Sequence, residues 1–139
     1  MNKLETTELQ EACQVIKTLQ GTVEHVNRKN GWHEDNDSSS KSKLAHLMLI
    51  VTEVSEACEA IRNGVPNNDV SKVLEMKPTS EFKFRFESDI KNSEGDELAD
   101  VLIRVLDYAT RHKINLADHV AAKIMYNATR GYKHGNKKI

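Results

Sequence analysis

Apolar residues recur at alternating steps of three and four along four stretches of the chain, which is the spacing of one face of an α-helix. The first stretch begins at a capping box formed by Thr7 and Gln10 and stops at Gly31. The second follows the polar run NDSSSKS and stops at Gly64. The apolar faces predicted for these two helices are Leu9, Ala12, Ile16, Leu19, Val23 and Val26, then Leu44, Leu47, Val51, Val54, Cys58 and Ile61.

Two shorter stretches complete the helical pattern. We expect a third helix to begin near Ser93 and to fray by Lys113, and a fourth to be capped by the Asn115 side chain and to end at Gly131. Their predicted apolar faces are Leu98, Val101, Leu102, Val105 and Ala109, then Val120, Ala121, Ile124 and Ala128. Helices of this number and length predict an all-α bundle.

The connection between the second and third helices, residues 65–92, is unusually long for a small domain. Within it Phe82, Phe84 and Phe86 alternate with polar residues, a spacing typical of a strand. We therefore expect a long excursion that contains a short hairpin, and connections of this length are usually functional or partly disordered.

The composition narrows the class of protein. A chain of 139 residues with two prolines and six glycines predicts a single domain, residues 1–139. Lys and Arg total 20 against 21 for Asp and Glu, so the overall charge does not favour nucleic-acid binding. The longest apolar run, LMLIV at 47–51, is far too short for a membrane span, and the N-terminus lacks a signal-like apolar segment. We expect a soluble cytoplasmic protein in which Cys13 and Cys58 are reduced core thiols.

Four carboxylates interrupt the helical pattern in two pairs, EVSE and ELAD. Residues three apart share one side of a helix, so Glu53 projects with Glu56, and Glu97 projects with Asp100. Either pair alone is explained equally well by a solvated helix face.

The surroundings of the two pairs favour a site over a solvated face. Neighbours such as Met48, Leu49, Ala99 and Ile103 are small or apolar, where a solvated face would carry Lys or Arg at i+4. Antiparallel neighbouring helices could also turn the two pairs toward each other. Four oxygen ligands without His or Cys suit Mg²⁺ or Mn²⁺ better than Zn²⁺. The sequence therefore predicts a magnesium site.

A basic row follows on the last predicted helix. Lys123, Asn127 and Arg130 are spaced four and three and share one face, with Lys133 and His134 just beyond in the basic tail. By itself the row is better explained as charge that complements the helix dipole. Beside a magnesium site, however, a cationic row is what a polyphosphate requires, and we expect these residues and the tail to contact the phosphates.

The only tryptophan, Trp32, lies in the loop GWHED between the first two helices. It is either a core residue or a wall for a nucleobase, and the sequence does not choose between them. We include Trp32 and the adjacent His33 among the candidate substrate-binding residues.

The runs LMLIVTEVSEACEAIRNG, ELADVLIRVLDYATRHKINL and KIMYNATRGYKHGNK, preceded by GWHED, resemble the MazG-like all-α nucleoside triphosphate pyrophosphohydrolases. The resemblance implies an antiparallel four-helix bundle subunit in which the four carboxylates bind Mg²⁺ and Lys123, Asn127 and Arg130 contact the substrate. It also implies homodimers, often paired into tetramers, whose sites borrow residues from a neighbouring subunit. Residues around Leu47 are apolar on every side of the second helix, which independently predicts a partner subunit. The connection at 65–92 departs from the family and leaves base specificity and assembly open.

The expected activity is hydrolysis of a ribo- or deoxyribonucleoside triphosphate at the α-phosphorus, giving a monophosphate and pyrophosphate. Magnesium lowers the pKa of the attacking water, which Glu53 or Glu56 orients, and the cellular role is control or housecleaning of nucleotide pools. A di-iron site would require Glu-x-x-His motifs, and neither His46 nor His112 is in that register. A non-enzymatic helical adaptor with an acidic face remains the alternative.

Overall fold

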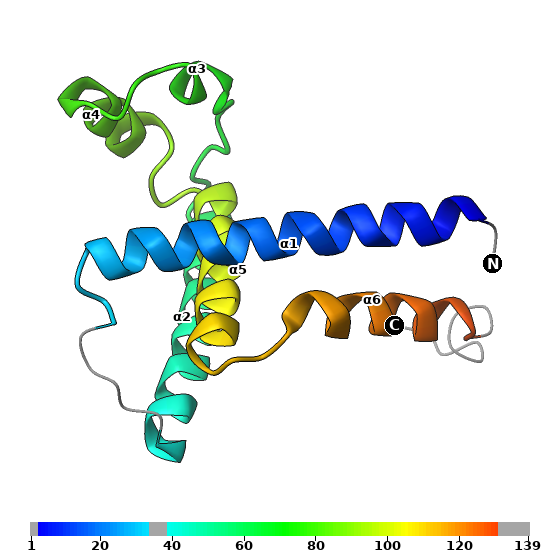
Figure 1. Ribbon diagram of the computed structural model, residues 1–139. Coiled ribbons are helices and arrows are strands. Elements are labelled where there is room, and N and C mark those ends of the chain that lie inside the picture. The colour runs from blue at the N-terminus through cyan, green and yellow to red at the C-terminus, as the bar shows by residue number, and fades with distance from the viewer. Residues whose placement is uncertain (1–2, 34–38, 131–139) are drawn as a thin grey trace. The chain divides into compact units, whose positions relative to one another are not determined.

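The computed structural model describes residues 3–33 and 39–130, with side chains from residue 7, and this part of the chain is all-α (Figure 1). It contains no strand in the described ranges. No helix among them has the length and apolar character needed to cross a membrane. The helices are α1 Lys3–Lys29, α2 Ser40–Arg62, α3 Ser71–Leu74, α4 Ser80–Asp89, α5 Glu94–Arg111 and α6 Leu116–Ala128.

The chain forms two compact units, one comprising Met1–Asn36 and Ala109–Ile139, the other Asp37–Tyr108. In the first unit α1 and α6 pack side by side in opposite directions (Figure 1). The Cys13 thiol donates a hydrogen bond to the Ala117 carbonyl at 3.5 Å, and Ala117 is fully buried. The small side chain of Ala117 thus lets the two helices approach closely.

Several helix ends are where local signals predicted them. Gly31 and Gly64 follow α1 and α2 with φ of 83° and 66°, the left-handed conformation that ends a helix. The Asn115 side chain accepts from the Asp118 N–H at 3.4 Å, and the Ser93 hydroxyl accepts from the Asp96 N–H at 3.3 Å. The start predicted at Thr7 is wrong, because α1 already begins at Lys3.

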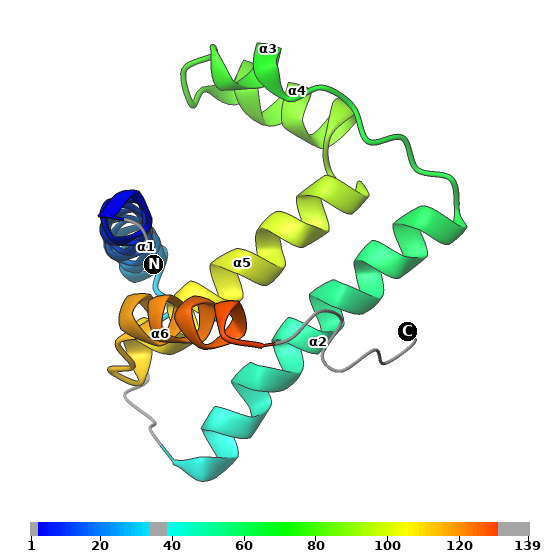
Figure 2. The same ribbon diagram turned by 90° about the vertical axis from the view of Figure 1, so that its right-hand side faces the viewer.

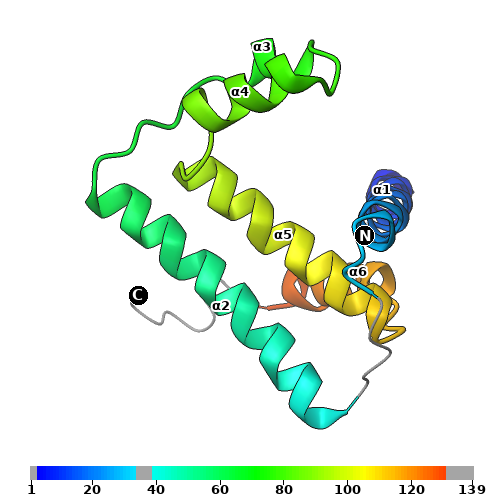
Figure 3. The ribbon, with the colours of Figure 1, turned by 90° about the vertical axis from the view of Figure 1, so that its left-hand side faces the viewer.

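In the second unit α2 and α5 run alongside each other in opposite directions (Figures 2 and 3). The connection between them contributes α3 and α4, which contact each other, and a long loop joins the end of α2 to α3, while α4 leads into α5 (Figures 2 and 3). Val73 of α3 and Ile90, which caps the end of α4, are buried. The excursion therefore has an apolar core of its own.

The hairpin predicted within 65–92 is wrong, because the three phenylalanines lie on helix α4. Thr79 caps this helix by accepting from the Phe82 N–H at 3.5 Å. Phe82 and Phe86 are one turn apart and stack, with ring centroids 6.1 Å apart, while Phe84 points outward with 65% of its surface exposed. Alternation over five residues also contains an i, i+4 pair, so the spacing alone could not exclude a helix.

The face of α2 that is buried differs from the predicted one. Glu53, Ala57 and Ala60 are buried, whereas the predicted stripe of Leu44, Leu47, Val51, Val54, Cys58 and Ile61 is exposed in the subunit. The two stripes differ by one residue, or about 100° around the helix. Because α2 is apolar on several sides, alanines could form the packed face and leave the larger side chains outside.

The predicted faces of the other helices are confirmed only in part. On α5 the predicted residue Ala109 is buried, whereas Leu98 and Leu102 are about half exposed, and the buried Leu106 was not in the predicted face. Cys58 is exposed, so its prediction as a core thiol is wrong, and Cys13 is half-buried. On α1 and α6 the predicted residues Ala12, Leu19, Val26, Ile124 and Ala128 are likewise exposed.

Candidate metal centre

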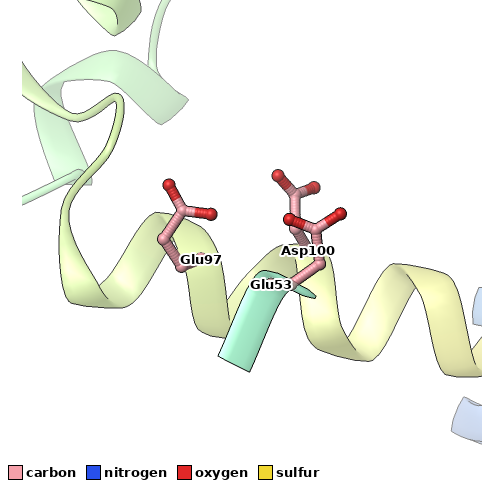
Figure 4. A group of neighbouring side chains, drawn as sticks. All are labelled: Glu53, Glu97 and Asp100. Atoms are coloured by element: carbon pink, nitrogen blue, oxygen red, sulfur yellow. The ribbon is translucent and has the colours of Figure 1, made fainter. Parts of the chain in front are cut away.

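Carboxylates from α2 and α5 meet at one point in the second unit (Figure 4). Glu53 is on α2, and Glu97 and Asp100 are one turn apart on α5. One oxygen atom from each carboxylate lies within 4.8 Å of the other two. Two helical stretches separated by more than forty residues in the sequence thus build one acidic centre.

Glu97 is the most unusual member of this centre. Only 4% of its surface is exposed, and its carboxylate has no hydrogen bond or ion pair with any residue that the structure describes. Burial, and then the negative charge of Glu56, raises the pKa of Glu97 above its ordinary value, with smaller contributions from Asp96, Asp100 and Glu53. A partly desolvated carboxylate that is crowded by like charges is unfavourable when ionised, and a cation at this point would offset the repulsion.

Asp100 is in a similar field. Burial raises its pKa, the charges of Asp96 and Glu53 raise it further, and only the Arg104 guanidinium acts in the opposite direction. The raised pKa values of Glu97 and Asp100 share one cause, the crowding of like charges in a partly desolvated place.

Arg104 is the residue of this centre that sequence reasoning missed. Its Nε–H donates to Glu53 Oε1 at 2.9 Å, and this contact links α5 to α2. The sequence signal for Arg104 was its position four residues after Asp100, on the same side of the helix. This position also contradicts the expectation that the acidic pairs have no Lys or Arg at i+4. The same guanidinium also acts to lower the pKa of Asp100, so Arg104 offsets part of the negative charge of the group.

Glu56 lies at the edge of the centre. Its side chain is exposed, and its carboxylate is not one of the three that meet within 4.8 Å. It is still close enough to raise the pKa of both Glu97 and Asp100. Of the four carboxylates predicted to converge, three therefore meet directly and the fourth adds to their field.

The donor chemistry of the centre fits a hard cation. The ligand atoms are carboxylate oxygens, and neither His nor Cys belongs to the group that meets among the described residues. Such a set suits Mg²⁺ or Mn²⁺. The convergence of three carboxylates, two of them on buried residues, separates this group from an ordinary acidic surface.

Of the predicted basic row, Lys123 and Asn127 lie on α6 in the first unit, whereas Arg130 lies beyond its end, because α6 stops at Ala128 and not at Gly131 as predicted. Lys123, Asn127 and Arg130 are all exposed. The Lys123 Nζ is 4.9 Å and the Arg130 Cζ 5.9 Å from the centroid of the Tyr126 ring, so one aromatic side chain holds both cations on one side of the helix. Lys133 and His134 lie outside the described residues.

Trp32 is not a core residue, because 62% of its surface is exposed. The loop that carries it is attached through its backbone, since the Arg111 Nη1–H donates to the Trp32 carbonyl at 3.3 Å. His33 follows it and is half-buried. Of the two roles considered for Trp32, the core role is wrong, and contact with a nucleobase stays a prediction.

Comparison with protein-family models, with curated proteins and with solved structures returns no match to this chain. The likeness to MazG-like pyrophosphohydrolases therefore depends on the motif residues and is carried forward as a proposal.

Proposed function

We propose that this protein is a magnesium-dependent nucleoside triphosphate pyrophosphohydrolase of the MazG-like type. The observation that carries the proposal is the convergence of the Glu97 carboxylate, which lacks a protein partner in the described chain, with those of Glu53 and Asp100. Carboxylates on two antiparallel helices, followed in sequence by a cationic row, match the needs of a triphosphate. The role would be the housecleaning or control of (deoxy)nucleotide pools.

Glu53, Glu97 and Asp100 would hold Mg²⁺, with Mn²⁺ as a possible substitute. When bound, the metal would supply positive charge to the phosphate oxygens and lower the pKa of water at the site. Arg104 keeps one oxygen of Glu53 in place, so Glu53 is less available as a base.

Glu56 is the better candidate for the general base, because its exposed carboxylate stands beside the centre without belonging to the group that meets. It would orient the attacking water and accept its proton. The water oxygen forms a bond to the α-phosphorus while the bond from that phosphorus to the bridging oxygen breaks. The products are a nucleoside monophosphate and pyrophosphate, and Lys123, Asn127 and Arg130 would hold the phosphates together with Lys133 and His134 of the tail.

The direct test is release of pyrophosphate from a panel of ribo- and deoxyribonucleoside triphosphates. We expect release from at least one of them in Mg²⁺, weaker or comparable release in Mn²⁺, and none after chelation by EDTA. Release of orthophosphate instead would mean attack at the γ-phosphorus. If no triphosphate is hydrolysed in either metal, the proposal is wrong.

A non-enzymatic helical adaptor is the alternative, and two observations favour it. Arg104 already pairs with Glu53, and the apolar stripe of α2 is exposed for a partner. An adaptor would show no pyrophosphate release in the same assay, so one measurement separates the two functions.

We also propose that the four long helices form a bundle subunit of a homodimer or tetramer, with the α2 stripe as the interface. Val51 and Val54 are each about half exposed in the subunit, and a row of large apolar side chains on a helix is usually covered. Covering the stripe with a second copy of the chain would remove that surface from water.

A double replacement, Val51→Glu with Val54→Glu, tests the interface. Charges buried between two copies are strongly unfavourable, so we expect the dissociation constant to rise by at least about a hundredfold. Light scattering at micromolar protein measures the mass, and circular dichroism checks that the helices remain. Ser55→Glu, which adds a charge at an exposed position beside the stripe, is the matched control. A monomeric wild-type protein would exclude the proposed assembly.

A further inference from the structure

A cavity of about 640 Å³ lies within the second unit, bordered by α3, α4 and the first half of α5. Its apolar wall includes Val73, Phe82, Phe86 and Ile90, of which Val73 and Ile90 are buried. The size falls within the usual range of small-molecule sites, roughly 300 to 1,000 Å³. The long connection at 65–92 thus folds into the wall of a chamber.

The chamber is continuous with the candidate metal centre. Asp100 lines the cavity and is also one of the three converging carboxylates. A ligand that filled the chamber would therefore have one end beside the acidic centre. Because this end is anionic protein surface, a phosphorylated ligand would need the cation that the same carboxylates would hold.

The aromatic wall suits a flat, weakly polar group. Phe82 and Phe86 are half-buried, stack with ring planes 26° apart, and both line the cavity. Nucleobases stack on aromatic side chains whatever their hydrogen-bonding pattern. Phe84 on the same helix points away and does not line the cavity.

Asn67 places a polar group at the rim of the chamber. Its Oδ1 accepts from the Gly95 N–H at 3.2 Å, so its amide nitrogen, a donor of two hydrogens, is the end not held by this contact. A Cβ at position 95 would be 2.5 Å from that oxygen, so the absence of a side chain at Gly95 permits the approach. Ring nitrogens and carbonyl oxygens of nucleobases accept hydrogen bonds from such an amide.

We propose that this chamber binds the nucleoside part of the substrate, with the base against Phe82 and Phe86, the Asn67 amide at its edge and the phosphates toward Asp100. The inference depends on the proposed function, and it assigns base recognition to the connection at 65–92 instead of Trp32.

The test is equilibrium binding by calorimetry in Mg²⁺. The probes are the α,β-methylene analogues of the nucleoside triphosphates, which cannot be split at the α-phosphorus, and inorganic tripolyphosphate, which has no base. We expect the wild type to bind at least one analogue more than tenfold more tightly than tripolyphosphate. Phe86→Ala should bind that analogue about tenfold more weakly and tripolyphosphate with unchanged affinity. Phe84→Ala, on the same helix, should bind both probes with wild-type affinity.

Two further variants keep the test independent of folding. Asn67→Asp retains the acceptor for the Gly95 N–H but removes the amide donor, so it should lower analogue binding and change the order of preference among bases. Trp32→Ala should leave the preference for the analogue over tripolyphosphate unchanged. Circular dichroism and light scattering establish that each variant has wild-type helix content and mass.

The possible failures are distinguishable. If the wild type binds neither probe, the proposed function and this inference both fall. If it binds both probes equally, or if Phe86→Ala and Phe84→Ala behave alike, only the chamber assignment is wrong. If Trp32→Ala loses the base preference and Phe86→Ala does not, the base binds at the loop after α1 and not in the chamber. A change in mass of Phe86→Ala without a change in binding would mean that a second copy of the chain fills the chamber.

Discussion

Replacing Glu97 by Gln is expected to abolish pyrophosphate release and, at neutral pH, to stabilise the metal-free protein. Glu97 would be a metal ligand. Replacing a residue that only supports a metal ligand usually lowers metal affinity or activity by about 10- to 100-fold. Loss of the ligand itself should therefore lower kcat/KM by at least about a hundredfold. The same replacement removes a buried negative charge that has no protein partner in the described chain. Activity and stability should therefore change in opposite directions.

The pH dependence follows from the raised pKa of Glu97. The pKa in the folded protein lies above the ordinary value of 4.5, so the folded state binds the proton more tightly than the unfolded chain. The stability that this proton contributes is complete below pH 4.5 and is lost as the pH rises through the raised pKa. Above that window the ionised carboxylate destabilises the metal-free protein, and Mg²⁺ should offset this by binding the folded state.

Thermal unfolding at pH 5 and pH 8, with and without Mg²⁺, measures this effect. We expect Mg²⁺ to raise the Tm of the wild type more at pH 8 than at pH 5, and to leave the Tm of Glu97→Gln unchanged at both. Glu59→Gln, at an exposed position of α2, is the matched control and should behave like the wild type. A Tm for Glu97→Gln below that of the wild type at pH 8 without metal would show that the carboxylate is structural.

Replacing Lys123 or Arg130 by Ala is expected to lower kcat/KM. The loss corresponds to about 2 to 4 kcal/mol of transition-state stabilisation, as for other charged contacts to phosphate. Both cations lie against the Tyr126 ring and are exposed, so neither replacement should disturb the helix. A cation complements the helix dipole only near the C-terminal end of the helix. The last turn of α6 contains no basic residue, so Lys123 lies too early in the helix for this role, and Arg130, just after the helix, is the better candidate for it.

Steady-state kinetics and thermal unfolding together test this second prediction. Lys17→Ala is the matched control, since Lys17 is an exposed cation that pairs with Asp118 at 3.8 Å, and such surface pairs contribute little. Its kinetics and Tm should stay close to wild-type values. Wild-type kinetics in both Lys123→Ala and Arg130→Ala, with lowered Tm, would assign these residues to the stability of α6 instead.

The sequence alone located several helix ends and the pairing of Glu97 with Asp100, because both depend on short-range rules. Caps such as Asn115 and stops such as Gly64 act through hydrogen bonds and dihedral angles within a few residues. The pairing of Glu97 with Asp100 follows from helical spacing alone. That Glu53 would face this pair was a further expectation, drawn from an antiparallel arrangement of neighbouring helices, and the structure brings the three together.

Where a pattern permitted two conformations, the local signal was insufficient. The phenylalanines of α4 fit a strand by alternation and a helix by their i, i+4 pair, and the Thr79 cap was the signal that would have favoured the helix. Packing of α3 against α4 buries Val73 and Ile90, and periodicity carries no information about such contacts.

The sequence determined that this protein is helical in its described parts, where several helices end, and that Glu97 and Asp100 project together. Only the tertiary structure decided which stripe of α2 is packed, that Arg104 pairs with Glu53, and that the connection at 65–92 builds a chamber beside Asp100. The physical reason is that α2 has apolar residues on several sides. Its own periodicity allows more than one buried face, and the choice among them depends on the shapes and charges of the helices packed against it.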